Sequence, residues 1–208
     1  MKITQKILRK IIKEELTKVL QESSAVGPED LPEGVKIMID QISEDEILIS
    51  YVDEYGDNNY GHMQIDTEVQ LNSQFPCLNA MMVAHVKTEN NYGPLLYDIA
   101  IEVATMKAGG LVSDRTIVRP PAYKVWEYYV NNRNNPDDVE IEQLDNENDS
   151  FNDGPTNDCL QTISYEYASE NDTSWMDEPL SKLYRKKPTT LETLEELDLL
   201  ILEDFELS

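Results

Sequence analysis

The sequence predicts an α+β domain built on a mixed, mostly antiparallel sheet that is flanked by helices. Three observations support this fold class. Four short apolar or alternating segments precede residue 90, a strand–turn–helix–strand–helix pattern occupies residues 78–132, and helical periodicity recurs near both ends of the chain. The chain has 208 residues, of which 40% are hydrophobic, enough for one ordinary domain with a core.

The N-terminal segment, residues 2–21, is predicted to form an amphipathic helix, because its apolar residues recur at helical spacing. Six Lys or Arg minus three Glu give residues 1–22 a net charge of +3. Residues 23–34 are rich in turn formers and are interpreted as a linker. We expect the helix to pack on the body of the protein or on a partner. Membrane-surface binding is the alternative, but the helix lacks the Trp and Phe anchors typical of it.

This same segment, KITQKILRKIIKEEL, resembles the Lys- and Ile-rich leaders found on otherwise unrelated proteins of tailed bacteriophages. In some phages such leaders direct proteins into the prohead and are cut after a Leu/Ile-x-Glu tripeptide. Leu20-Gln21-Glu22, followed by Ser23, fits that pattern. The resemblance implies a phage protein that is located in the host cytoplasm or associated with the virion, with cleavage after Glu22 as a further expectation.

Four strands are expected before the first central helix. The segments before residue 60 are short and apolar and are joined as a hairpin, the third segment alternates, and the fourth is apolar enough to be buried. These strands are predicted at residues 35–40, 47–53, 60–71 and 78–89.

A helix–strand–helix unit follows the fourth strand. Residues 90–94 form a turn, and Pro94 suits the first turn of a helix, where its missing N–H costs little. Apolar residues recur at helical spacing from Leu95 to Met106, and Gly109-Gly110 ends the helix. Residues 111–113 are a short strand, after which Pro120-Pro121 opens a second helix. A strand that feeds a helix through such a turn leaves backbone N–H groups available to an anion.

Residues 78–132 resemble the acetyl-CoA-binding half of the GNAT N-acetyltransferases. Gly93 matches the last small residue of that family's Gln/Arg-x-x-Gly-x-Gly/Ala turn, Leu96 the apolar position after it, and Ala122 the alanine that opens the last helix. The resemblance implies a GNAT-like fold, acetyl-CoA as co-substrate and an amine as acetyl acceptor. The family's two helices between its first two strands are missing here, because the connection is too short for them.

The resemblance implies a cofactor site made mainly of backbone groups. Thr88 replaces the family's Gln/Arg, and Asn91 replaces its first glycine but can adopt the same left-handed conformation. The other interpretation of this turn is a structural helix start that binds no ligand. The residues expected to contact acetyl-CoA are Val86, Thr88, Asn91, Tyr92, Gly93, Leu95 and Leu96.

Acetyl transfer needs a base for the ammonium proton and often a tyrosine that protonates the leaving thiolate. Glu89, at the end of the fourth strand, is the candidate base, whereas His85 is interpreted as a core histidine. Trp126 occupies the position of the family's tyrosine, so Tyr128 and Tyr129 are the candidate acids, with core aromatic residues as the alternative.

Two arginines are candidates for a phosphate site, and several acidic residues are candidates for a metal site. Arg115 and Arg119 could hold a phosphate, but pairing with Asp98 and Glu102 is the preferred interpretation. His62 with nearby carboxylates is too sparse for zinc, and the acidic loops lack a calcium-binding pattern, so no metal is predicted.

The C-terminal third combines acidic loops with further predicted elements. Residues 139–144 and 162–168 are expected as the last two strands, with acidic loops at 145–158 and 169–178. Residues 180–184 are interpreted as a short docking segment. Residues 185–208 are predicted to form an acidic helix that begins at a capping box of Thr189 and Glu192. The predicted GNAT-like domain therefore spans residues 35–184, between the leader with its linker and this helix.

The net charge of −24 excludes several classes of function. Subtracting the leader's +3 leaves −27 for the rest of the chain, so unassisted binding to nucleic acid or an anionic membrane is not expected. Cys77 and Cys159 have no metal-ligand spacing and are interpreted as free thiols of a reducing compartment.

Three functions remain open at this stage. The first is an acetyl-CoA-dependent N-acetyltransferase acting on an unknown amine. The second is a catalytically inactive GNAT-fold protein that is packaged in the virion or binds a host protein through one of its terminal helices. The third, suggested by the charge of −27, is an acidic mimic of nucleic acid that occupies a DNA-binding protein.

Overall fold

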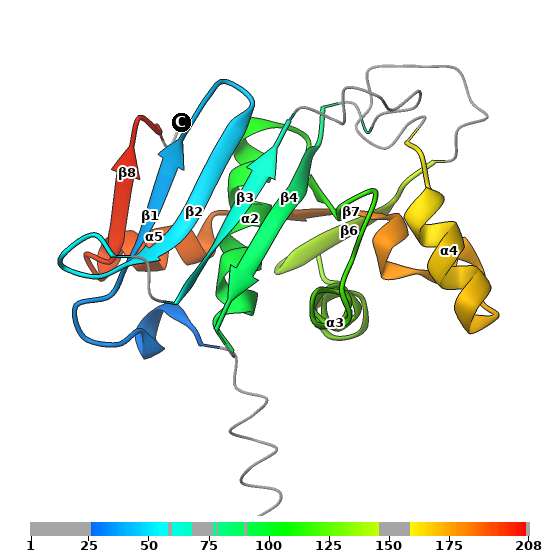
Figure 1. Cartoon of the computed structure of the whole chain (residues 1–208), viewed down its shortest axis with the longest axis horizontal. Coiled ribbons are helices and arrows are strands. Elements are labelled where there is room, and N and C mark those ends of the chain that lie inside the picture. Colours follow the sequence, from blue (N-terminus) through cyan, green and yellow to red (C-terminus); the bar gives the residue numbers. More distant parts are fainter. Residues whose placement is uncertain are drawn as a thin grey trace, which may run out of the picture.

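The computed structural model describes residues 26–57, 60–67, 77, 79–89, 91–145 and 159–206. Within these ranges the chain is an α+β protein in which one eight-stranded mixed sheet is flanked by four α-helices (Figure 1). The predicted fold class is confirmed at this level. The predicted leader helix, its cleavage site after Glu22 and residues 146–158 of the predicted acidic loop lie outside the described residues.

The sheet has the strand order β6-β7-β5-β4-β3-β2-β1-β8 and is mostly antiparallel, as predicted. Only the β4–β5 and β1–β8 pairs are parallel among these strands. The four strands expected before residue 90 are confirmed as β1 to β4. The strands are β1 (Lys36–Gln41), β2 (Glu46–Val52), β3 (Gly61–Asp66), β4 (Met81–Thr88), β5 (Leu111–Val112), β6 (Val139–Gln143), β7 (Lys182–Lys186) and β8 (Leu200–Glu203).

The predicted central helices are confirmed as α2 (Gly93–Lys107) and α3 (Pro120–Tyr128). α2 lies behind the centre of the sheet in Figure 1 and contacts β2, β3, β4, β5 and β7. α5 (Thr189–Glu196) packs against α2. α3 continues into a π-helical turn, Tyr129–Arg133, and α4 (Thr162–Asn171) lies beyond α3 at the end of the molecule that carries β6 and β7.

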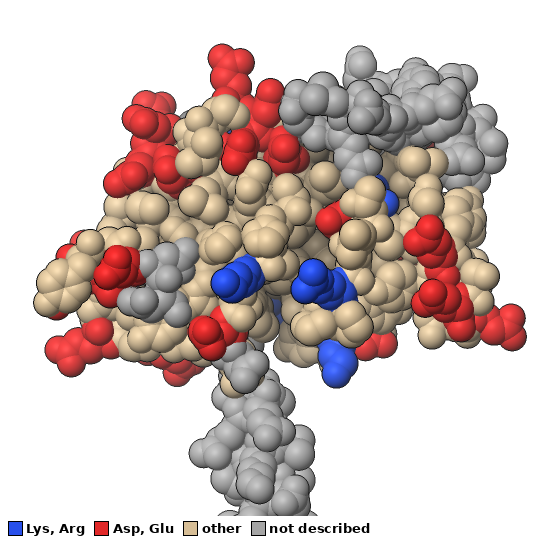
Figure 2. All heavy atoms as spheres, viewed as in Figure 1, with Lys and Arg blue, Asp and Glu red and all other residues tan. Residues whose placement is uncertain are grey.

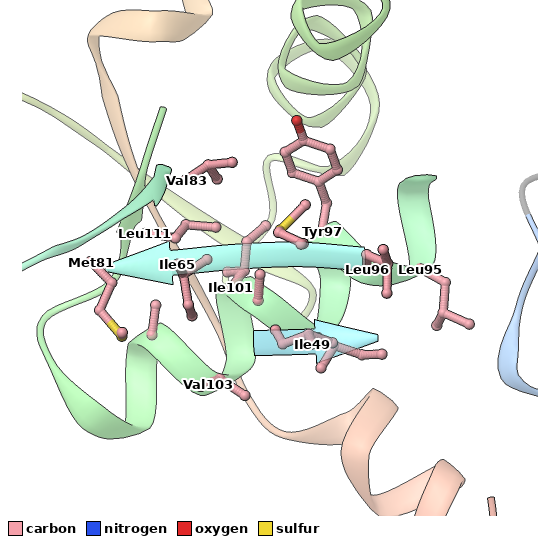
Figure 3. Packing of buried hydrophobic residues seen from close by; sticks show 14 of the residues in the cluster. Ile49, Ile65, Met81, Val83, Leu95, Leu96, Tyr97, Ile101, Val103 and Leu111 are labelled. Atoms are coloured by element: carbon pink, nitrogen blue, oxygen red, sulfur yellow. The ribbon is translucent and has the colours of Figure 1, made fainter. Parts of the chain in front are cut away.

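The main core lies between α2 and the sheet. Alternate residues of β2 and β3 are buried on the side that faces α2, as their period of two predicts. Figure 3 shows Ile49 and Ile65 of these strands in one cluster with Leu96 and Ile101 of α2, and all four side chains are fully buried. Each such side chain stabilises the fold by roughly 1.5–3 kcal/mol. This layer fixes α2, and with it the turn that precedes α2.

The prediction of a strand at residues 162–168 was wrong, because this segment forms α4. Ile163, Tyr165 and Tyr167 alternate and favour a strand in the sequence. The buried positions, however, are Ile163, Ser164 and Ala168, which lie on one side of a helix. The strand that pairs with β6 is β7, which includes most of the segment that was interpreted as a docking segment.

The predicted C-terminal helix is only partly correct. α5 ends at Glu196, and the chain reverses at Asp198, whose φ of 57° is left-handed. Leu200 to Glu203 then forms β8 beside β1 instead of continuing the helix. The predicted capping box is also wrong, because the residue that caps α5 is Pro188 and it contributes no side-chain hydrogen bond.

The start of α5 is capped instead by Glu102, a fully buried carboxylate on α2. Its Oε1 accepts from the backbone N–H of Thr190 at 2.7 Å, and its Oε2 accepts from Leu191 N–H at 2.8 Å. Lys186, also buried, donates its Nζ to Glu102 Oε1 and to Thr190 Oγ1. The carboxylate satisfies the free N–H groups of the helix and neutralises the buried lysine.

We expect Glu102→Gln to lower the free energy of unfolding by about 3–5 kcal/mol, because it leaves the Lys186 ammonium buried without its counter-charge. Urea unfolding measures this change. Glu195→Gln changes an exposed carboxylate on α5, the helix that Glu102 caps; it is the control and should shift the value by less than about 0.5 kcal/mol. Equal stability of the Glu102 variant and the wild type would contradict this account.

The prediction of free thiols was wrong. Cys77 and Cys159 are both buried and form a disulfide with their Cα atoms 4.4 Å apart. The bond joins the chain just before β4 to the segment that leads into α4, across a sequence separation of 82 residues. The two cysteines stand together with Met82, Val112 and Leu183 in a second, smaller apolar cluster.

Replacing both cysteines by serine should lower the free energy of unfolding by up to about 4 kcal/mol, because the unfolded chain loses a long covalent loop. Urea unfolding of the oxidised wild type and the double variant gives the difference. A thiol reductant should destabilise the wild type by a similar amount and leave the double variant unchanged. The prediction is refuted if complete reduction of the wild type, checked by titration of its thiols, leaves its free energy of unfolding unchanged.

Candidate functional site

The parallel pairing of β4 and β5 ends early and leaves one edge of β4 open. The pairs Met81–Leu111 and Met82–Val112 are the full extent of this pairing, whereas β4 continues to Thr88. A β-bulge at Ala84 accompanies this change, because Ile65 pairs with Val83 but Gln64 pairs with His85. Bulges bend a strand and increase its twist. We call the unpaired edge of residues 84–88, with the start of α2 and the facing part of α3, the β4 opening.

Two peptide groups of β4 point into this opening. Glu89 N–H donates to the carbonyl of Tyr60 at 2.9 Å, so its backbone faces β3. In an antiparallel pair, alternate residues face the partner strand and the others face away. The backbone groups of Thr88 and Val86 therefore face the opening, where no strand of the described residues pairs with them. Both were predicted to contact a cofactor.

The turn into α2 is held in place from the protein side. Asn91 has φ 71°, the left-handed conformation that the sequence led us to expect. Its carbonyl accepts from Val26 N–H at 3.1 Å, and the Tyr92 carbonyl accepts from the Tyr51 hydroxyl at 2.7 Å. A Cβ on Gly93 would lie 3.4 Å from Thr88 Oγ1, so the turn and the end of β4 are adjacent.

The first turn of α2 has no side-chain cap. The N-cap residue, Tyr92, contributes no hydrogen bond from its side chain, and Pro94 has no N–H to offer. The side chains of Leu95 and Leu96 are buried in the core, so only their backbone groups can serve a ligand. The N–H groups of Gly93 and Leu95 precede the first intrahelical bond, which Leu96 N–H makes to the N-cap carbonyl, so these two carry the positive end of the helix dipole and suit an anion.

Basic side chains gather around the opening. Figure 2 shows Lys and Arg over the end of β4 and over α3, on a face that is otherwise rimmed by Asp and Glu, with the surface set back between them. β4 contains Lys87, and α3 with its N-cap contains Arg119 and Lys124; all three are exposed. Among the described residues none of the three forms an ion pair, whereas Arg133 and Arg185 are paired with carboxylates.

The predicted catalytic residues differ in exposure and in their hydrogen bonds. Glu89 is exposed directly after β4, at the rim of the opening. Tyr128 is 51% exposed on α3. Tyr129 is buried, and its hydroxyl donates to Asp98 Oδ1 at 2.8 Å; burial, followed by the Asp98 charge, raises the pKa of Tyr129 well above its usual value. Trp126 is buried against Tyr97 and Tyr184. Only Glu89 and Tyr128 present free side chains to solvent.

The interpretation of His85 as a core residue was wrong. It is exposed on the face of the sheet away from α2, and its ring lies 5.4 Å from that of His62 on β3. Desolvation, the charge of His85 and the charge of Lys87 all lower the pKa of His62. The backbone of His85 pairs with Gln64 of β3, and its side chain lies on the same face of β4 as Lys87.

The expected pairing of Arg115 and Arg119 with Asp98 and Glu102 was also wrong. Asp98 accepts from Arg133 NH1 at 2.6 Å, and Glu102 caps α5. Arg115 is buried where its Nε donates to the Ser113 carbonyl at 3.1 Å and its NH2 donates to the Leu180 carbonyl at 2.6 Å. Burial lowers the pKa of Arg115 to about 10. Arg115 thus links the end of β5 to the short helical turn before β7, and its guanidinium is not available to a ligand.

Other surface features lie away from the opening. One hollow is lined by Lys107, Phe205 and their neighbours, and another runs along α4 past Tyr165. No cluster of three or more His, Cys, Asp or Glu that could hold a metal ion occurs in the part of the chain that the structure describes. Over the same residues, no helix combines the length and apolar character that a bilayer crossing requires.

The sequence prediction missed several residues around the opening. Lys87 and Lys124 lie beside it, and Tyr97, one helical turn after Gly93, lies against Trp126 of α3. Exposed lysines carry no distinctive signal, and Tyr97 occurs among apolar residues at helical spacing, which is typical of a core position.

Comparison with protein-family models, with curated proteins and with solved structures found no match. The fold and the opening describe the protein as follows: it is an α+β protein in which the pairing of two parallel strands, β4 and β5, ends early beside the N-terminus of α2.

The chain contains two histidines, so their NMR titration curves can be assigned readily. We expect the pKa of His62 to lie below 6.5 and to rise when Lys87 is replaced by Met, because that variant removes a nearby positive charge. Lys187→Met, which removes an exposed lysine after β7, is the control and should leave the titration of His62 unchanged. An unchanged pKa in the Lys87 variant would show that the Lys87 charge does not reach this site.

Proposed function

We propose that this protein is a GNAT-like acyltransferase that binds acetyl-CoA in the β4 opening and transfers the acetyl group to an amine. The observation that carries the proposal is the early end of the β4–β5 pairing at Met82 and Val112, directly beside the uncapped start of α2. The element order supports it further. Four strands, a helix, a strand and a helix precede two adjacent antiparallel strands, β6 and β7.

The opening offers chemically suitable groups for the amide-containing arm and the phosphates of acetyl-CoA. The amide-containing arm of the cofactor can hydrogen-bond, like an added strand, to the free peptide groups of Val86 and Thr88. The pyrophosphate can accept from the backbone N–H groups of Gly93 and Leu95. Arg119 and Lys124, exposed and without ion pairs among the described residues, can neutralise the remaining phosphate charge.

In the proposed reaction the amine nitrogen attacks the thioester carbonyl, the C–N bond forms and the C–S bond breaks. The products are the N-acetyl amine and the free thiol of CoA. Glu89 is suited to accept the proton that the acceptor ammonium must lose, because it is exposed at the rim of the opening. Tyr128 is the remaining predicted candidate for returning a proton to the thiolate, since Tyr129 already donates to Asp98.

Acetyl-CoA titrated into the protein in a calorimeter tests the binding step. Arg119→Glu combined with Lys124→Glu should weaken binding at least about tenfold at low salt, since phosphate contacts are charge-assisted. Lys187→Glu makes the same kind of charge change at an exposed residue after β7 and should leave binding nearly unaltered. Glu89→Gln should lower the transfer rate by about 10²-fold or more with little effect on binding. No binding to the wild type at millimolar acetyl-CoA would end the proposal.

A second candidate is a protein that keeps this fold without the chemistry and binds another macromolecule. The acidic side chains that rim the face in Figure 2 favour it, and phage origin and packaging rest on the leader resemblance alone. If purified virions contain a peptide that begins at Ser23 and the protein transfers no acetyl group, this candidate replaces the first. Co-purification with a DNA-binding protein would instead favour the nucleic-acid mimic.

A further inference from the structure

The Tyr97 hydroxyl differs from those of the other buried tyrosines. Four tyrosines are buried among the described residues: Tyr51, Tyr97, Tyr129 and Tyr184. Three of these donate to protein oxygens: Tyr51 to Tyr92 O, Tyr129 to Asp98 Oδ1 and Tyr184 to Pro179 O, at 2.7 to 2.8 Å. Tyr97 is 2% exposed as a whole residue, and none of the described residues accepts a hydrogen bond from its hydroxyl. The hydroxyl oxygen is not among the fully buried unpaired atoms of the described residues, where Ser50 Oγ stands alone, so the tip of this otherwise buried side chain reaches the surface.

The position of Tyr97 relates that hydroxyl to the β4 opening. Tyr97 lies in the second turn of α2, four residues after Gly93, and its ring packs edge-on against Trp126 of α3 at 5.0 Å. Figure 3 shows the hydroxyl directed away from the aliphatic cluster. The charge of Asp114, two residues beyond the end of β5, acts on the same group. The hydroxyl thus lies beside α3 and near the chain that follows β5, two segments that border the opening.

The chemistry of the group suits a fixed donor. Burial, with the Asp114 charge as a smaller cause, raises the pKa of Tyr97, so the hydroxyl keeps its proton through the neutral range. No hydrogen bond joins the Tyr97 hydroxyl to Asp114, whose Oδ1 accepts from Thr116 N–H, Thr116 Oγ1 and Ile117 N–H. The ring is immobilised by Trp126 and the core, so a bound acceptor would meet a donor that is already oriented.

We propose that the Tyr97 hydroxyl is a ligand-binding group of the β4 opening, where it donates a hydrogen bond to the amide or thioester carbonyl of an acyl-CoA. The inference rests on the function proposed above and adds a residue that the sequence pattern did not indicate. The ligand carbonyl would accept the hydrogen bond that none of the described residues accepts from the Tyr97 hydroxyl. The site then has backbone groups on the β4 side and one side-chain donor on the α2 side.

Tyr97→Phe separates a ligand-binding role from a structural one. Because the hydroxyl has no protein partner, its removal should leave the thermal midpoint unchanged or raise it. The dissociation constant for acetyl-CoA, measured by calorimetry, should rise about fivefold to tenfold, as expected for one lost hydrogen bond. Tyr184→Phe is the matched control, since it removes a hydroxyl that donates to Pro179 O and should lower the thermal midpoint without a comparable loss of affinity.

The outcomes distinguish the two proposals. If the wild type binds acetyl-CoA and Tyr97→Phe binds it equally well, the role of Tyr97 is refuted while the proposed function stands. If Tyr97→Phe lowers the thermal midpoint as Tyr184→Phe does, the hydroxyl is structural and the inference is also refuted. If the wild type does not bind acetyl-CoA at all, both proposals fall together. Weaker binding at undiminished stability in Tyr97→Phe alone supports the inference.

Discussion

The packing of α2 against the sheet is the interaction on which the other parts of the structure depend. From Leu95 to Ala104 nearly every residue of this helix is buried, on the sheet side and on the sides that face α3, α5 and β7. Three polar groups on α2 then fix the surroundings: Asp98 holds Tyr129 and Arg133, Glu102 caps α5, and Thr105 accepts from Lys186 N–H. Because α2 is anchored on these sides, the turn that precedes it is also held in place.

The opening follows from a mismatch between the two strands that α2 connects. β4 extends for eight residues, but β5 has two, so the parallel pair cannot continue beyond Val112. The chain after β5 is drawn away by Arg115, whose guanidinium binds the Ser113 and Leu180 carbonyls in the interior. The bulge at Ala84 bends β4 in the same region. The unpaired N–H and C=O groups of such an edge are a template on which another extended chain or an amide-containing ligand can pair.

The parts of the fold that depend on local pattern could be predicted from the sequence. Alternation in β1 to β3, helical spacing in α2 and the proline signals of α2 and α3 gave the right elements. Residues 162–168 could not be assigned in this way, because their strand-like alternation is outweighed by the burial of Ile163, Ser164 and Ala168 on one helix face. The disulfide, the cap from Glu102 and the parallel pairing of β8 with β1 each join residues far apart in the sequence. Periodicity contains no information about such contacts.

The candidate site also combines features that follow from local sequence pattern with features that depend on the folded structure. Backbone positions such as Thr88, Asn91 and Gly93 follow from a turn pattern, whereas Lys87, Lys124 and the Tyr97 hydroxyl acquire meaning only from their place around the opening. A net charge of −24 would repel an anionic ligand at long range. At physiological ionic strength, however, exposed charges beyond about 8 Å are largely screened, so the nearest charges decide the local potential. The basic residues and the start of α2 can therefore favour phosphate on a strongly acidic protein, and the remaining acidic surface disfavours nucleic acid as a competing polyanion.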